Sequence, residues 1–203
     1  LTGGSLLKTI EGTTVIASGT VNSPLSNFKG TLTNNATLNL ADNLTKNIAG
    51  TGTTVLQSDN VEVTTATTVA GTLDLNNKTL DMQNSVSNDA LTIGTLTGTG
   101  KLKIDVDLTA KNADYLSLSG GTGTITLTDI SILNPMQIDT GLTIISASDS
   151  SKLNFIVDVD DKEIAGYTYK FTTNSFGVLS ISRSIENLTF EDFITGTVKG
   201  KLV

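Results

Sequence analysis

Gly71-Thr72-Leu73-Asp74-Leu75-Asn76-Asn77, joined through one lysine to Thr79-Leu80-Asp81-Met82, is the stretch that decides the fold. An earlier stretch has the same order: Gly30-Thr31-Leu32, then Asn34-Asn35, then Thr37-Leu38-Asn39-Leu40. Each copy consists of a short strand, a small polar turn and another short strand. Such a unit cannot bury an apolar face alone, so it must stack on its neighbours. The repeat therefore predicts a solenoid of stacked β coils.

A second repeated phrase supports the same interpretation. Ile48-Ala49-Gly50-Thr51-Gly52 returns as Leu96-Thr97-Gly98-Thr99-Gly100, whose first residue lies 48 positions further on. The first phrase returns after 41 positions. Two coils of roughly 20–24 residues fit within each interval, which lies in the range of solenoid repeats.

The composition favours β structure throughout. The chain has 203 residues, of which 37% are hydrophobic, only 4% are aromatic and none is Trp. A compact sandwich of this length normally uses more large rings in its core. Thr suits a pleated surface, whereas Asn and Gly suit tight turns. The composition predicts an all-β chain with many turns and a narrow core of small apolar side chains.

Charge and residue types exclude several function classes. Thirteen Lys and Arg against 20 Asp and Glu give a net charge of −7. Nucleic acids and anionic membranes require concentrated positive charge, so we expect neither as a partner. The chain has no His and no Cys. Disulfides, Ser-His-Asp or Cys-His catalysis and His or Cys zinc sites are therefore excluded within these residues, and we expect no cofactor.

The chain shows no targeting or membrane segment. No stretch approaches the ~20 apolar residues of a transmembrane helix. No basic segment followed by an apolar one opens the chain, as a signal peptide would. Leu1 is not a start methionine, so we expect a processed piece of a longer protein.

Strand periodicity assigns inward and outward residues. Leu102, Ile104, Val106 and Leu108 alternate with polar residues, which include Asp105 and Asp107. Period-two alternation predicts one buried face and one solvated face. We therefore expect Ile104 to point inward, and likewise Leu116 in the stretch that follows. Asp105 and Asp107 are expected on the wet face.

Near residue 150 the Gly- and Thr-rich phrases give way to strands that are denser in apolar and aromatic residues. Residues 1–149 are expected to form the coils, and residues 150–203 a carboxyl-terminal cap and folding nucleus of the same domain. Within the cap, the alternation of residues 167–171, a turn at 172–177 and an apolar run at 178–181 predict a β-hairpin. Residues 185–195 fit a short helix or a strand about equally well. Atypical terminal elements commonly cover the open end of a solenoid.

Residues 70–183 resemble the carboxyl-terminal part of an autotransporter passenger, a pertactin-like right-handed parallel β-helix. The rung-like phrases are residues 71–77, 91–94 and 96–102. The stretch from Ala113-Asp114-Tyr115-Leu116 to Gly120 resembles the family's Ala-Asp-x-Leu element. Residues 141–145 and the hairpin resemble its final section. The family often has Trp after the last glycine, where this chain has Val178.

The resemblance implies both the fold and a role. The expected fold is an all-β, single-stranded right-handed parallel β-helix with a carboxyl-terminal β-hairpin cap. The expected role is that of a non-enzymatic passenger stem, part of a virulence-related adhesin, secreted to the bacterial surface outside the outer membrane. Implied partners are a host-cell receptor, a glycan or another copy for cell-to-cell association, and the parent protein's own outer-membrane β-barrel.

Candidate catalytic and metal-binding residues are few, and we predict no catalytic, cofactor or metal site. Asp105 with Asp107, or Asp158 with Asp160 and Asp161, have the chemistry of glycosidase acids or calcium ligands. Spacing of two along a strand is also how a solvated face looks, and we favour that interpretation. Gly120-Gly121-Thr122-Gly123-Thr124 begins like a calcium-binding repeat but lacks its Asp, so we expect a turn.

Other residues have weaker signals. Tyr115, Tyr167 and Tyr169 have the rings to stack on sugars, but strand spacing favours cap core for Tyr167 and Tyr169. Arg183 is the one arginine, which argues against a polysaccharide lyase. Glycosylation-type Asn-x-Thr sequences occur at Asn35, Asn43, Asn77 and Asn187, where Asn-rich turns also produce them.

Two other functions and one other fold remain open from sequence. A carbohydrate- or receptor-binding solenoid with contacts along a Thr and Asn ladder is the second function. A polysaccharide-acting enzyme on a β-helix is the third. The alternative fold is a pair of immunoglobulin-like sandwich domains divided near residue 110, against which the Gly-Thr-Leu rungs and the scarcity of Pro argue.

Overall fold

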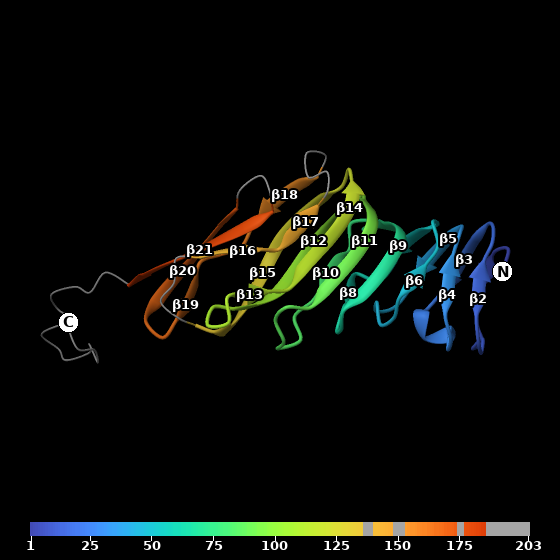
Figure 1. The fold of residues 1–203 in the computed structure, drawn as a ribbon, viewed down its shortest axis with the longest axis horizontal. Coiled ribbons are helices and arrows are strands. Elements are labelled where there is room, and N and C mark those ends of the chain that lie inside the picture. The colour runs from blue at the N-terminus through green and yellow to red at the C-terminus, as the bar shows by residue number, and fades with distance from the viewer. Residues whose placement is uncertain (136–139, 148–152, 174–176, 186–203) are drawn as a thin grey trace, which may run out of the picture.

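The protein is a parallel β-helix whose coils stack into a rod. The computed structural model describes residues 1–135, 140–147, 153–173 and 177–185. In Figure 1 the strands follow one another along the long axis from the N-terminal coils to a cap at the other end. A 3-10 turn, η1 (Leu25–Asn27), is the helical element of this described part. It contains no helix long and apolar enough to cross a membrane.

Within the described residues, the strands form one antiparallel sheet and two stacks, which are parallel apart from one short antiparallel strand in the second. The first stack contains β1 (Gly4–Ser5), β2 (Thr14–Ile16), β3 (Thr20–Ser23), β4 (Leu32–Asn34), β5 (Thr37–Leu40), β6 (Ile48–Ala49), β7 (Thr53–Leu56), β9 (Thr67–Asp74), β11 (Ala90–Thr97), β14 (Tyr115–Gly121) and β17 (Ile145–Ala147). The second contains β8 (Asn60–Glu62), β10 (Thr79–Asp81), β12 (Thr99–Asp107), β13 (Asn112–Ala113), β15 (Thr124–Asn134) and β18 (Asn154–Val157). The antiparallel sheet contains β16 (Thr140–Thr143), β19 (Lys162–Ile164), β20 (Tyr167–Thr173) and β21 (Val178–Ile185).

The register of the first stack explains why the repeats share a sequence. Equivalent threonines of successive coils are Cα partners, in the order Thr20, Thr37, Thr53, Thr72 and Thr95. The next position of each strand points inward and is buried, in the order Val21, Leu38, Thr54, Leu73 and Leu96. Period-two alternation thus gives each coil one inward column and one outward threonine column.

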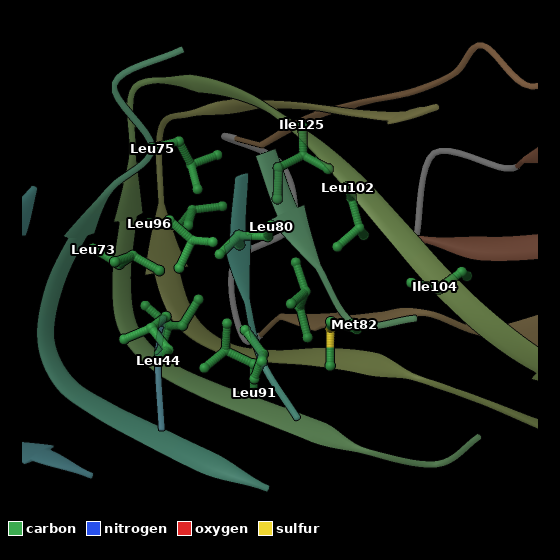
Figure 2. Close-up of a cluster of buried hydrophobic side chains, with 14 of the residues drawn as sticks. Leu44, Leu73, Leu75, Leu80, Met82, Leu91, Leu96, Leu102, Ile104 and Ile125 are labelled. Carbon is green, nitrogen blue, oxygen red and sulfur yellow. The ribbon is translucent and has the colours of Figure 1, made fainter. Parts of the chain in front are cut away.

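The core is one continuous cluster of mainly aliphatic side chains that runs through the coils into the cap. Figure 2 shows leucines, isoleucines and Met82 meeting between the strands. Ile104 and Leu116, which the alternation assigned to the interior, are both 0% exposed, which confirms that prediction. Aliphatic residues fill most of the narrow coil, and Phe28 is a fully buried ring among the N-terminal coils.

The repeated glycines are required by the close approach of successive coils. A Cβ at Gly71 would lie 2.2 Å from the carbonyl oxygen of Gly52. A Cβ at Gly94 would lie 2.1 Å from that of Ala70. No side chain fits at such a distance, so each glycine allows the chain to turn against the coil beneath it.

The predicted hairpin is confirmed, since β20 and β21 pair antiparallel from Tyr167–Ile185 to Thr173–Leu179. β16 extends this sheet by pairing antiparallel with β21. β18 still pairs in parallel with β15, so the two kinds of pairing interleave along the chain. The division near residue 150 stays a prediction, and residues 186–195 lie outside the described part.

Candidate functional site

Asp105 is buried, and the prediction of a solvated position for it was wrong. Its exposed fraction is 1%. The loop of residues 83–89, between β10 and β11, covers the outer face of β12 at this point. The main-chain N–H groups of Asn84 and Ser85 each donate a 2.7 Å hydrogen bond to Oδ2 of Asp105. Alternation along β12 distinguishes its two faces but does not show that a loop covers the second.

Asp114, in the Ala-Asp-x-Leu stretch, is a second buried carboxyl with an exposed fraction of 0%. Its Oδ2 accepts a hydrogen bond from the N–H of Asp105 at 2.7 Å, and its Oδ1 accepts one from the N–H of Asp89 at 3.0 Å. Burial raises the pKa of Asp114 to about 7, against the lowering effect of those two hydrogen bonds. The nearby carboxylates of Asp105 and Asp89 raise this pKa further.

The same corner holds the turn of residues 107–113 in place. Ser87 Oγ donates to Oδ1 of Asn112 at 2.5 Å. Asp107, half-buried rather than fully wet, accepts hydrogen bonds from the N–H of Ala110 at 2.8 Å and from Nδ2 of Asn134 at 2.7 Å. These bonds lower the pKa of Asp107. Asp105 and Asp107 therefore act as acceptors for loops and do not face a common cleft.

A hollow of about 380 Å³ lies beside this braced corner. The loop and the turn supply one side of it, and residues 141–146 of β16 and β17 supply the other. Its polar lining side chains are Asn88, Lys111, Asn112, Tyr115, Thr143 and Ser146. Together they provide an ammonium group, two amides, a phenol and two hydroxyls. This set can hydrogen-bond hydroxyls and carboxylates and can place a ring against Tyr115.

Most of these residues were missed from sequence. Tyr115 alone was named there, as a ring able to stack on sugars. Lys111 and Asn88 have positive φ angles of 58° and 81°. Such angles mark tight turns but do not indicate that a residue binds a ligand. The contacts that bring residues 88, 111 and 143 together join different coils and have no signature in the sequence.

In the second group of carboxylates, Asp160 and Asp161 line a hollow of about 370 Å³ together with Asp129 and Lys162. Asp158, Asp160 and Asp161 are exposed, and Asp161 pairs with Lys170 at 3.6 Å. Nearby, Lys162 pairs with Asp129 at 2.6 Å. Burial raises the pKa of Asp129, but hydrogen bonds from Lys162 and Gln83 outweigh burial and lower the pKa overall. In the described ranges, no three His, Cys, Asp or Glu side chains are grouped to hold a metal ion.

The two tyrosines of the cap pack in or against the apolar core. Tyr169 is 1% exposed and belongs to the apolar cluster, and Tyr167 packs against that cluster. This confirms the cap-core prediction for both. The guanidinium of Arg183 lies 3.5 Å from the centre of the Tyr167 ring, a cation–π contact that occupies both groups. The prediction of a turn at residues 120–124 was wrong for most of the stretch, because Gly120 and Gly121 end β14, Thr124 begins β15 and residues 122–123 connect the two strands.

The sequence matches no known protein family and no curated protein. Four solved chains match the structure. One is the crystal structure of the Haemophilus influenzae Hap adhesin, with a TM-score of 0.60 and 19% sequence identity over 90% of this chain. The match covers 23% of the adhesin, so this chain spans about a quarter of its length. At this identity the likeness shows that the two share a fold.

Proposed function

We propose that this chain is a stem segment of a bacterial autotransporter passenger, exposed at the cell surface, where it forms part of an adhesin and nucleates passenger folding. The proposal is supported above all by the combination of a continuous parallel coil with an antiparallel cap, a fold shared with the Hap adhesin. The Ala-Asp-x-Leu resemblance is a second support, because Asp114 bonds the loop at Asp89 and strand β12 at Asp105 to the start of β14.

A non-enzymatic role agrees with the chemistry of the carboxylates. Asp105 and Asp114 are buried and bonded to main-chain N–H groups. The pair named from sequence, Asp105 and Asp107, accepts hydrogen bonds from different segments. Glycoside hydrolysis needs two carboxyl groups on either side of a substrate in a cleft, and this pair has no such arrangement.

A surface-display assay tests the proposal. The chain would be placed between an export signal and an outer-membrane translocator in a Gram-negative host. We expect an antibody to label intact cells, external protease to leave the folded chain intact, and the cells to attach to epithelial cells or to one another. Cells carrying the translocator alone are the control. A folded, displayed chain that adds no attachment would overturn the adhesin role, and retention inside the cell would overturn the passenger role.

A further inference from the structure

We propose that the hollow between the 107–113 turn and strands β16 and β17 is a binding site for a saccharide that bears a carboxylate. The proposal adds a ligand to the chain and does not depend on the proposed surface role. It rests on the size of the hollow, on its unpaired polar groups and on the rigidity of the corner behind it.

The size and polarity of the hollow suit a small sugar. Its volume of about 380 Å³ lies at the lower end of the range for small-molecule sites. Six of the described side chains that line it are polar, and one of them, Tyr115 at the start of β14, contributes a half-buried ring. An aromatic face beside several hydrogen-bonding groups matches the apolar face and hydroxyls of a sugar ring.

The polar groups of the hollow are free to bind a ligand. Within the described residues, the ammonium of Lys111, the phenol of Tyr115 and the amide nitrogen of Asn112 have no hydrogen-bond or ion-pair partner. The hydroxyls of Thr143 and Ser146 also have no hydrogen-bond partner among the described residues. Each is exposed or half-buried, so binding would not first have to break a protein contact.

Lys111 sets the preference for a carboxylate. Among the residues that the structure describes, it is the one cationic side chain that lines the hollow. The neighbouring acids do not pair with it directly. Asp105 accepts from the N–H of Asn84, and Asp114 accepts from the N–H groups of Asp105 and Asp89. Asp107 accepts from Ala110 and Asn134. A hydrogen bond from an ammonium to a carboxylate is about twice as strong as a neutral one. An acidic sugar would therefore bind better than its neutral counterpart.

The wall that presents these groups is held in place before a ligand arrives. Ser87 joins the loop to Asn112 at 2.5 Å, and the N–H of Tyr115 donates to the carbonyl oxygen of Asp89 at 2.9 Å. Asp114 bonds to the N–H of Asp89 at 3.0 Å. A site that is already ordered loses less entropy when it binds.

Protein-observed NMR and calorimetric titration of the whole chain test the proposal. The acidic probes are digalacturonate and 3′-sialyllactose, which represent uronate and sialic sources of the same carboxylate, and lactose is the neutral probe. We expect saturable binding of at least one acidic probe, at least about tenfold tighter than lactose. Amide shifts should change at residues 88, 111–115 and 141–146.

Lys111→Gln is the decisive variant, and Lys29→Gln, which removes a charge at an exposed position outside the hollow, is its control. We expect Lys111→Gln to lower the affinity for the acidic probe to that for lactose, with an unchanged melting temperature, and Lys29→Gln to bind like the parent. No saturable binding of either acid, equal affinity for lactose, or an unaffected Lys111→Gln would each overturn the proposal. The display assay does not use this site, so its outcome stands separately.

Discussion

The main-chain N–H of Asp105 donates a 2.7 Å hydrogen bond to Oδ2 of Asp114. This bond ties β12 to the start of β14, and the other oxygen of Asp114 holds the loop at Asp89. One buried carboxyl therefore fixes three segments of the chain. Its neighbour Asp105 also has a buried oxygen, Oδ1, with no hydrogen-bond partner among the described residues. Burial raises the pKa of Asp114 to about 7, so this carboxyl is costly to ionise and the stability of the corner should depend on pH.

Asp114→Asn should change how stability depends on pH. The pKa of Asp114 is about 7 in the folded chain and 3.8 in its ordinary state. Between these values the folded state binds more protons than the unfolded state, so this residue makes the parent less stable as pH rises from about 4 to about 7. The slope is at most about 1.4 kcal/mol per pH unit. Urea unfolding of parent and variant from pH 4 to 8 measures it.

The variant should lose one hydrogen bond, because its amide faces an N–H donor, and should therefore be less stable at pH 4 by about 1–3 kcal/mol. This deficit should shrink or reverse by pH 8, where the parent must ionise Asp114. Asp107→Asn is the control. The pKa of Asp107 is lowered by Ala110 and Asn134, so its contribution is present above its ordinary pKa and is lost on acidification. Parallel profiles for the parent and Asp114→Asn would contradict the raised pKa.

Gly71→Ala should destabilise the coil. The added Cβ would lie 2.2 Å from the carbonyl oxygen of Gly52, so neighbouring coils would have to separate. Overpacking of this kind costs about 1–3 kcal/mol. Gly120→Ala is the matched control, since a Cβ there meets nothing within 4 Å. Thermal unfolding followed by circular dichroism compares the two, and equal melting temperatures would show that the coils adjust freely.

The coil and the hairpin could be predicted from sequence because both depend on local periodicity. The Gly-Thr-Leu phrases record the stacking register, and alternation placed Ile104 and Leu116 inside. The burial of Asp105 could not be predicted, because it depends on a loop about 20 residues away that folds over β12. The hollow depends on residues 88, 111 and 143, which no short pattern links. Sequence periodicity shows which residues lie on each face of a strand, whereas contacts between coils determine which segment covers that face.

Leu116→Asp should unfold the chain. Leu116 is 0% exposed and lies between Leu91 and Ile145 in the parallel stack. An unpaired carboxylate there has no hydrogen-bond donor to replace water, and the lost packing alone costs about 2–5 kcal/mol. Thr92→Asp, at an exposed position of β11, is the control and should fold normally. If Leu116→Asp melts like the parent, the assignment of inward residues is wrong.

Tyr169→Ala should slow refolding if the cap is the folding nucleus. Tyr169 is 1% exposed and belongs, with Phe171 and Leu179 of the cap strands, to the apolar core. Its truncation should cost about 3–5 kcal/mol. In a nucleus this loss appears mostly as a lower folding rate, whereas at a late-forming position it appears as faster unfolding. Leu38→Ala, in an N-terminal coil, is the comparison and should mainly accelerate unfolding. Stopped-flow refolding from urea measures both rates, and a normal refolding rate for Tyr169→Ala would place the nucleus elsewhere.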